Sequence, residues 1–314
     1  MVLHINDAFL LGCGLIRRLK DNALALFELE KLHDSFGARL TGIDLRGPLS
    51  GELIAAIHAA VDRYSLLHFP NQQFNDDIHL AFTRQLGEPE ENHLARGEEG
   101  KVSYFGTIGN VQADGTVLRN DHQRTKFLTG NNMWHTDSSF RPIPAYLSIN
   151  CVYETPAEGG ITEFVSARAA YDRLPESKKN EIDQLVVIHD YVYSRSKVAP
   201  DAVSDSLAKS LPPVRQKLVR TNPNNGAKNF YVGSHAKAIE GWSESASREL
   251  IDYLLSSATD PQDIYSHQWA VGDVVMWDNR CLLHRGRGYD ADKYRRYMRQ
   301  TRVGGKGLTF DEGA

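Results

Sequence analysis

A histidine and an aspartate two residues apart, His135 and Asp137, could together hold a metal ion. On an extended segment residues i and i+2 point to the same side, so one imidazole nitrogen and one carboxylate oxygen can converge on a point. A second histidine from another strand would complete a set of two histidines and one carboxylate. Such a set leaves three open positions and suits the oxygen chemistry of Fe(II). An isolated His-x-Asp tripeptide is usually a surface pair, so other segments must decide.

The segment Trp277–Gly286 offers the second histidine. It has the pattern of an aromatic strand end, then a turn, then His284. Two arginines follow this histidine, Arg295 after 11 residues and Arg299 after 15. A planar guanidinium grips a carboxylate with two parallel hydrogen bonds, which a lysine cannot do. The segment therefore adds a third metal ligand and cations that suit an organic acid.

Several motifs, in one order over most of the chain, closely resemble the TauD/TfdA family of 2-oxoglutarate-dependent dioxygenases. The likeness runs from about Phe27 to Val303 and is nearer to the 2,4-dichlorophenoxyacetate dioxygenase branch than to the taurine branch. The motifs are WHTDSSF from Trp134, WDNRCLLHRGRGYD from Trp277, YRRYMRQT from Tyr294, GARLTGIDL from Gly37, EGGITEF from Glu158, YVGSH from Tyr231, and Glu240-Gly241. The resemblance implies an α+β fold with a double-stranded β-helix (jelly-roll) core flanked by helices.

The resemblance also implies cofactors and the residues that bind them. The iron ligands of the family fall on His135, Asp137 and His284, and the co-substrates are 2-oxoglutarate and O2. The 2-oxoglutarate carboxylate is expected at Arg295 and at the hydroxyl of Thr162. The expected reaction hydroxylates a small anionic substrate and releases succinate and CO2. Where the hydroxylated carbon bears an ether oxygen, as in an aryloxyalkanoate, the ether is cleaved.

Substrate contacts follow from the same resemblance. Arg299 stands where the family holds the anionic group of the substrate, and Asn131 stands where a taurine-type enzyme contacts its substrate. His93 and Arg96 lie in the loop over residues 88–100, a region that contributes substrate contacts in relatives. His235, in the YVGSH motif, is a further candidate. A carboxylate substrate is favoured over a sulfonate because of the branch that the motifs resemble.

The RRYMR segment predicts which arginines face the metal. If it is extended, Arg295, Tyr297 and Arg299 share one face, and Arg296 and Met298 take the other. We expect the first set to point inward, where Arg295 would bind 2-oxoglutarate and Arg299 the substrate. The competing interpretation is that Arg295 is a solvated surface arginine, and that Arg299 is an outward-facing charge or a structural partner of an acidic residue such as Asp278 or Asp290.

Three other functions remain open at this stage. A cupin-like isomerase or epimerase with another divalent metal would not need Arg295 and Thr162 together. A non-catalytic binding protein on the same fold would usually lack a metal ligand, and none is missing here. A taurine-like dioxygenase would differ only in preferring a sulfonate.

Composition indicates a globular protein with an ordinary core. The chain is 41% hydrophobic and 24% charged, with a net charge of −4, which gives no support for nucleic-acid binding. Three cysteines without CxxC spacing favour a reducing cytoplasm. No apolar run near the start is long enough to span a membrane, so no membrane partner is expected. By analogy with relatives, a homo-oligomer is expected.

The pattern of apolar residues predicts helices early and strands later. Residues 51–64, 75–86, 166–174 and 243–258 have helical spacing or capping patterns. Short runs rich in β-branched and aromatic residues are expected as strands, at 37–45, 66–70, 145–154, 161–166, 185–193, 228–235, 264–269, 274–279 and 295–303. One core argues for a single domain over residues 27–314, preceded by an extension over residues 1–26.

Overall fold

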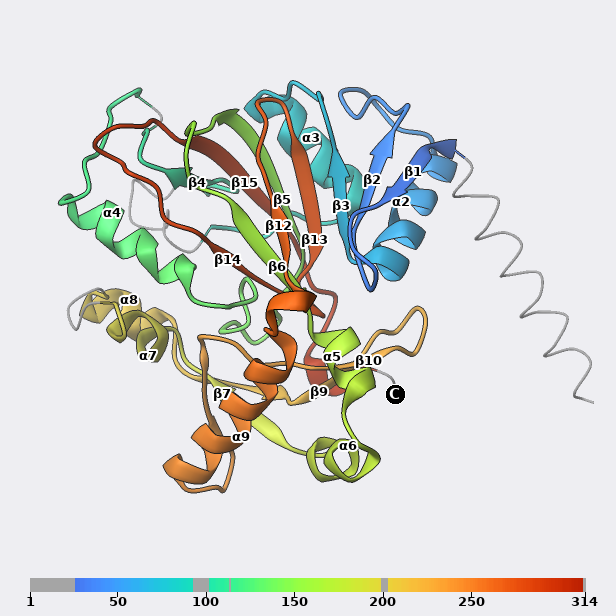
Figure 1. Cartoon of the computed structure of the whole chain (residues 1–314), viewed down its shortest axis with the longest axis vertical. Helices are drawn as coiled ribbons and strands as arrows, with labels where there is room; N and C mark the ends of the chain where they lie inside the picture. Colours follow the sequence, from blue (N-terminus) through green and yellow to red (C-terminus); the bar gives the residue numbers. More distant parts are fainter. Residues whose placement is uncertain (1–25, 93–101, 113, 199–202, 313–314) are drawn as a thin grey trace, which may run out of the picture.

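The chain folds around two facing β-sheets (Figure 1). The computed structural model describes residues 26–92, 102–112, 114–198 and 203–312, so the expected extension falls outside the described residues except for Leu26. The larger sheet has the order β1-β2-β3-β13-β5-β15-β4, with one parallel pair, β2–β3. Its strands are β1 (Glu28–Lys31), β2 (Ala38–Thr41), β3 (Leu66–Phe69), β4 (Gly106–Gly109), β5 (Ala145–Glu154), β13 (Val274–Asp278) and β15 (Tyr297–Gly304).

The smaller sheet has the order β12-β6-β14 and faces the larger one. Its strands are β6 (Thr162–Ser166), β12 (Tyr265–His267) and β14 (Leu282–Gly286). One apolar cluster joins the sheets, with Trp277 and Met298 from the larger sheet and Phe164 and Leu282 from the smaller. Burial of both inner faces stabilises the sandwich because apolar surface leaves water.

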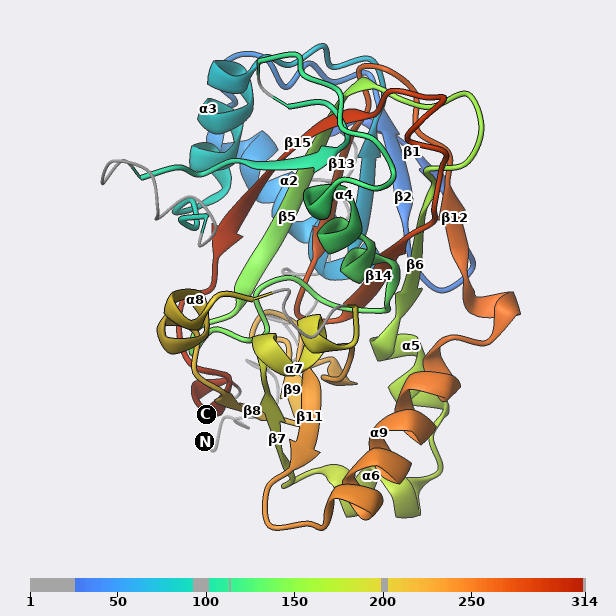
Figure 2. The same ribbon diagram turned by 90° about the vertical axis from the view of Figure 1, so that its left-hand side faces the viewer.

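Two amphipathic helices, α2 (Gly51–Tyr64) and α3 (Asp76–Leu86), cover the outer face of the larger sheet (Figure 2). The side chain of Ser50 accepts a hydrogen bond from the Leu53 amide, and that of Asn75 from the Ile78 amide. These N-caps satisfy amide groups that a helix start leaves without partners. The helices predicted over residues 51–64 and 75–86 are confirmed.

The lower half of the molecule in Figure 1 carries the remaining helices and two small sheets. Their apolar side chains form a second cluster, which also contains Trp134 and Leu283 from the metal-ligand segments. The strands are β7 (Val186–His189), β8 (Val214–Lys217), β9 (Val219–Thr221), β10 (Lys228–Phe230) and β11 (Ala236–Ile239). The helices are α5 (Ala167–Arg173), α6 (Glu176–Ile182), α7 (Tyr191–Ser196), α8 (Asp205–Ser210) and α9 (Glu244–Ala258), with α4 (Gln123–Leu128) nearer the sheets.

The run over residues 185–193 differs from its expected strand. Only Val186–His189 is a strand, and the helix α7 begins directly after it. The cause is local, because the side chain of Asp190 accepts a hydrogen bond from the Tyr193 amide and caps a helix of β-branched and aromatic residues. The α+β class expected from the sequence is otherwise confirmed. Among the described helices, none combines the length and apolar character needed to cross a membrane.

Candidate metal and co-substrate site

The segment after Trp134 and strand β14 bring the three expected metal ligands together. His135 and His284 form an antiparallel bridge, in which each amide donates to the other's carbonyl, at 3.0 and 2.8 Å. His135 Nε2 lies 3.9 Å from Asp137 Oδ1, and His284 Nε2 lies 3.8 Å from Asp137 Oδ2. The ligand atoms of all three side chains lie within 4.8 Å of one another. Two imidazole nitrogens and one carboxylate oxygen thus face a common point, and this donor set fits Fe(II).

Burial sets the protonation of these ligands. It lowers the pKa of His135, and it lowers the pKa of His284 to about 3. His135 Nδ1 lies 2.8 Å from the Met133 carbonyl and donates to it, which leaves Nε2 with a lone pair toward the cluster. Burial raises the pKa of Asp137, but basic groups around it, His284 and Arg302 first, bring it below its ordinary value. The site therefore offers neutral imidazoles and a carboxylate anion, the states that bind a metal.

Hydrogen bonds hold Asp137 in one orientation. Its Oδ2 accepts from Ser148 Oγ at 2.6 Å and from Gln300 Nε2 at 3.1 Å. Its amide donates to Asn279 Oδ1 at 3.1 Å, and Asn279 Nδ2 in turn donates to Ser148 Oγ at 2.8 Å. Such outer contacts fix the direction of a ligand before the metal binds.

A cavity of about 180 Å³ opens beside the three ligands. One part of its wall is apolar, with Ile108, Leu128, Trp277, Tyr289 and Ala291. The other part is polar, with Asn120, Asn131, Asn132, Thr162, Arg287, Arg296 and Gln300. A hollow in which an apolar wall faces convergent polar groups is typical of a site for a small organic molecule.

Arg296 is the buried cation of this cavity. It is 7% exposed, its Nε has no hydrogen-bond partner, and no ion pair to it is found among the described residues. Burial lowers its pKa to about 10, which still leaves the guanidinium charged at pH 7. A buried charge without a partner is costly, so this guanidinium is suited to an anion that enters the cavity.

The hydroxyl of Thr162 is the second group suited to an anion. It lines the cavity from β6, and it accepts a hydrogen bond from the indole nitrogen of Trp269 at 3.0 Å. Because Trp269 donates, the hydroxyl proton of Thr162 is left to point elsewhere, and an anion in the cavity can accept it. Trp269 is itself held edge-on against the ring of His267, at 4.5 Å between centroids.

The predicted inward face of the RRYMR segment is wrong by one residue. Arg295 is half exposed, makes two hydrogen bonds to Glu154 of 2.6 and 2.9 Å, and does not line the cavity. Arg296 and Gln300 line the cavity instead, while Met298 between them packs in the sandwich core. A slip of one residue moves every side chain of a strand to the other face.

Arg299 likewise points away from the cavity, toward α3. Its Nε and Nη2 donate to Asp76 at 3.1 and 2.6 Å, and its Nη1 donates to Thr107 Oγ1 at 2.7 Å. Its guanidinium also lies over the ring of Phe105, 4.5 Å from the centroid. The alternative weighed above for Arg299, a structural partner of an acidic residue, is therefore the one that the geometry supports, with Asp76 as that partner.

Of the remaining residues expected to contact the substrate, one lines the cavity and another does not. Asn131 lines the cavity, and its Oδ1 accepts from Arg195 Nη2 at 3.0 Å. His235 is buried behind His135, with 6.3 Å between ring centroids, and its Nδ1 lies 3.3 Å from Ser139 Oγ, so it does not line the cavity. His93 and Arg96 lie outside the described residues.

The YVGSH motif supports His135 from behind. A Cβ on Gly233 would lie 3.2 Å from the Cα of His135, and Gly233 has φ +145°, which other residues rarely adopt. The amide of the next residue, Ser234, donates to the Trp134 carbonyl at 2.8 Å. The motif therefore positions the ligand segment and does not itself reach the cavity.

Sequence reasoning missed four residues of the site, Arg287, Arg296, Gln300 and Trp269. The sequence contained a signal for Arg296 and Gln300, which is the apolar side chain of Met298. An apolar side chain in a strand usually lies on the buried face. That face carries Arg296 and Gln300. Nothing in the sequence pairs Trp269 with Thr162, since 107 positions separate them.

Comparison with known proteins shows the family of the chain. The family described as "Taurine catabolism dioxygenase TauD, TfdA family" matches residues 28–302. An alpha-ketoglutarate-dependent 2,4-dichlorophenoxyacetate dioxygenase of Burkholderia sp. (strain RASC) is 37% identical over 278 residues, which cover 88% of this chain and 94% of the relative. An (S)-phenoxypropionate/alpha-ketoglutarate-dioxygenase of Delftia acidovorans is 35% identical over 290 residues, 89% of this chain and 95% of the relative.

A solved structure of a relative has the same fold. The crystal structure of AAD-2 in complex with Mn(II) and N-oxalylglycine superposes with a TM-score of 0.82 at 36% identity, over 90% of this chain and 98% of that chain. The expected jelly-roll fold, the family and the enzyme class are thereby confirmed. The chain belongs to the TauD/TfdA family of dioxygenases.

Proposed function

We propose that this chain is an Fe(II)- and 2-oxoglutarate-dependent dioxygenase that oxidises a small carboxylate of the aryloxyalkanoate class. The observation that carries the proposal is one cavity that joins the His135, Asp137 and His284 ligands to the buried guanidinium of Arg296. The matched relatives support the substrate class, because two of them act on phenoxy acids by their names. The solved relative supports the cofactors, because it holds Mn(II) and N-oxalylglycine, a molecule with two carboxylates like 2-oxoglutarate.

The chemistry divides between the metal and the protein. Iron, when bound, supplies the activation of O2 that is coupled to oxidative decarboxylation of 2-oxoglutarate to succinate and CO2. Arg296 binds the distal carboxylate of 2-oxoglutarate through its fork of donors, and Thr162 adds a hydroxyl donor. Asp137 keeps its direction through Ser148 and Gln300. The apolar wall keeps water from the reacting carbon.

Arg287 is the proposed anchor for the carboxylate of the substrate. Among the described residues that line the cavity, the basic side chains of arginine or lysine type are Arg296 and Arg287. Its side chain is about half exposed, and its Nε is 3.8 Å from Glu163, which is paired more closely with Arg285 at 2.6 Å. A cation so weakly held can turn to a substrate anion at the mouth of the cavity.

A substrate panel tests the proposed function. The purified chain, with Fe(II), ascorbate and 2-oxoglutarate, is offered 2,4-dichlorophenoxyacetate, (S)-2-phenoxypropionate, their amides, taurine and an alkyl sulfate. Succinate released above the level without substrate should be highest for the phenoxy acids, and phenol should appear with it. Equal release with every compound, or none with any, would contradict the proposal. Asp137→Ala serves as the inactive control. The homo-oligomer stays a prediction, which light scattering tests.

A further inference from the structure

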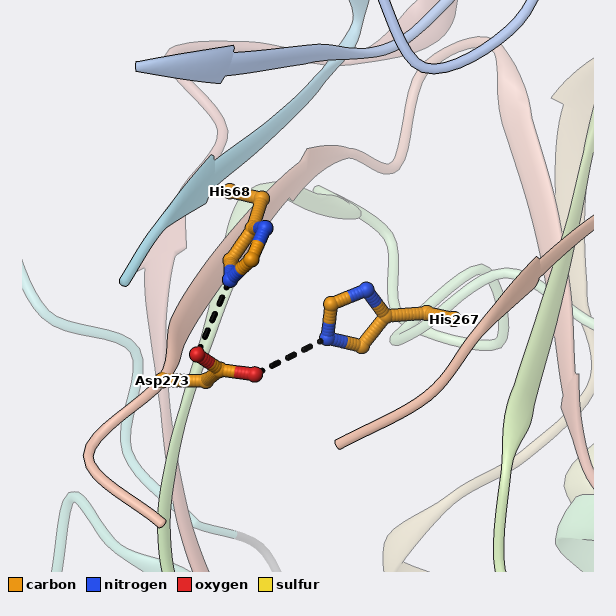
Figure 3. A group of neighbouring side chains, drawn as sticks. All are labelled: His68, His267 and Asp273. Atoms are coloured by element: carbon orange, nitrogen blue, oxygen red, sulfur yellow. Dashed lines mark ion pairs between the residues drawn. The ribbon is translucent and has the colours of Figure 1, made fainter. Parts of the chain in front are cut away.

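A second group of two histidines and one aspartate lies apart from the cavity. His68 comes from β3, His267 from β12, and Asp273 from the turn before β13, and the three side chains point toward one another (Figure 3). His68 Nε2 lies 2.9 Å from Asp273 Oδ1, and His267 Nε2 lies 3.4 Å from Asp273 Oδ2. None of the three is among the described residues that line the cavity. The group therefore needs an explanation separate from the iron site.

The turn that carries Asp273 is fixed by its backbone. The amide of Asp273 donates to the Ala270 carbonyl at 3.0 Å, and the Ala270 amide donates to Asp273 Oδ2 at 2.9 Å. Between them Gly272 has φ +87°, a conformation that favours glycine. The Gln72 amide donates to the Gly272 carbonyl at 2.8 Å and ties this turn to the end of β3. The carboxylate is therefore held between the two imidazoles.

Asp273 is a buried carboxylate that no lysine or arginine balances among the described residues. It is 3% exposed and His267 is 2% exposed, while the side chain of His68 is 12% exposed. The ion pairs found for Asp273 are those with the two histidines. A buried carboxylate is stable only when it is paired, hydrogen-bonded or bound to a metal.

The two imidazoles lie close to the carboxylate of Asp273, but their hydrogen-bond angles are poor. Among the described residues, neither His68 Nε2 nor His267 Nε2 meets the angle needed for a hydrogen bond, although each faces a carboxylate oxygen. The Nδ1 of His267 lies 3.2 Å from the hydroxyl of Tyr265, which can accept the ring proton there. In that tautomer His267 Nε2 presents a lone pair to a carboxylate, an arrangement that a cation between them would stabilise.

We propose that His68, His267 and Asp273 bind a divalent transition-metal ion of the zinc class. Imidazole and carboxylate donors suit Zn²⁺, whereas Mg²⁺ and Ca²⁺ prefer oxygen donors alone. In a tetrahedral site with bonds of about 2.1 Å, ligand atoms lie about 3.4 Å apart, and one ligand atom from each of the three side chains lies within 4.8 Å of the other two. The carboxylate faces each ring with a different oxygen, so small rotations of the carboxylate and of the partly exposed His68 ring would bring one oxygen and both Nε2 atoms to that spacing. Water completes the fourth position.

The bound ion ties together strands from both sheets. His68 and the Asp273 turn belong to the larger sheet, and His267 belongs to the smaller one. His267 also contacts Trp269, which donates to Thr162 in the cavity wall. The proposed role is therefore structural, on the side of the sandwich that supports the co-substrate pocket.

Metal binding to the full chain tests this site once the iron site is removed. In the variant His135→Ala/Asp137→Ala, equilibrium dialysis against Zn²⁺ or Co²⁺ should leave one ion per chain by mass spectrometry. Co²⁺ should add visible absorption bands of a four-coordinate site. Addition of Asp273→Asn or of His267→Gln to this variant should remove the ion, and addition of His33→Gln, a histidine near the surface, should not.

Two results would contradict the proposed metal site. Absence of bound metal in His135→Ala/Asp137→Ala would overturn the proposal, and this measurement needs no change in the cluster itself. One ion that persists in well-folded Asp273→Asn and His267→Gln variants would overturn it as well, because the ion would lie elsewhere. If these variants do not fold, a crystal of His135→Ala/Asp137→Ala soaked in Zn²⁺ decides, since anomalous scattering must then peak between the three side chains.

Discussion

The indole nitrogen of Trp269 donates to the hydroxyl oxygen of Thr162 over 3.0 Å, in a buried contact between the segment after β12 and the start of β6. The hydroxyl can then give its own proton to an anion in the cavity. Replacing Trp269 by Phe keeps an aromatic ring and removes the donor. We expect the apparent KM for 2-oxoglutarate to rise about 2- to 10-fold, the effect of one neutral hydrogen bond, while kcat changes little. Steady-state succinate release measures both.

Two results would show that Trp269 serves only packing. One is an unchanged KM for 2-oxoglutarate with a lowered melting temperature. The other is an equal fall in kcat for every substrate with no change in KM. Trp242→Phe is the matched control, because Trp242 is 38% exposed and should affect neither constant.

Arg296→Lys should impair binding of 2-oxoglutarate much more than Arg295→Lys. Lysine keeps the charge but loses the fork of donors. One charge-assisted hydrogen bond contributes about 1.5–3 kcal/mol, so the KM should rise roughly 10- to 100-fold. Arg295 holds Glu154 at the surface, and its replacement should leave this KM within about twofold. A large effect from Arg295→Lys with none from Arg296→Lys would restore the first assignment.

The contrast between these two arginines shows where sequence reasoning ended. The ligands His135, Asp137 and His284 could be found because local spacing and family motifs both carry them. The side of the strand to which Arg296 points could not be predicted from its separation in sequence from His284 alone. The loop over residues 287–296 determines where β15 begins. Strand β15 has buried residues on both faces, so alternation of polar and apolar side chains is weak there.

Helices were easier to predict than partners across the sheets. Asn75 and Ser243 cap α3 and α9 through contacts three residues away, which a sequence displays directly. The contact of Trp269 with Thr162 and the cluster around Asp273 join residues far apart in the chain. Such contacts depend on sheet order and register, which the pattern of one strand does not contain.

Loss of a metal ligand should remove iron binding and leave the fold intact. His135→Ala, Asp137→Ala and His284→Ala should each abolish turnover, because two remaining donors no longer define the site. The far-ultraviolet circular dichroism should match the parent protein. Anaerobic addition of Fe(II) and 2-oxoglutarate should give a weak visible band in the parent and not in these variants. An active Asp137→Ala variant would remove this residue from the ligand set.

Acid should destabilise the metal-free protein through its buried histidines, two of which, His79 and His189, lie outside the metal site. Burial lowers the pKa of His79 to about 4 and that of His189 to about 3, from an ordinary 6.5. Below pH 6.5 the unfolded chain therefore binds protons that the folded chain refuses. The free energy of unfolding should fall as pH drops from 6.5 toward 4, by up to about 1.4 kcal/mol per pH unit for each group. Urea titration of the metal-free chain measures the slope, which His79→Gln should reduce; an equal slope in this variant would exclude His79 as a cause.

Arg287 and Arg299 should separate substrate binding from stability. Arg299 pairs with Asp76 and lies over Phe105, so Arg299→Ala should lower the free energy of unfolding by about 1 kcal/mol or less. The KM for a phenoxy acid should stay nearly the same, since this guanidinium faces α3. Arg287→Ala should instead raise the KM for a phenoxy acid and leave the free energy of unfolding nearly unchanged. Arg287 lines the cavity, and the ion pair found for it among the described residues is a 3.8 Å contact with Glu163.

The readout for Arg287 is the preference for an acid over its amide. If Arg287 holds the carboxylate, the parent protein should favour the acid and Arg287→Ala should lose most of that preference. Oxidation of 2-oxoglutarate without substrate should continue at the parent rate in the variant, because Arg296 and the metal ligands are unchanged. A preference kept in Arg287→Ala but lost in Arg299→Ala would mean that the strand turns its other face to the substrate in solution, and the anchor would return to Arg299.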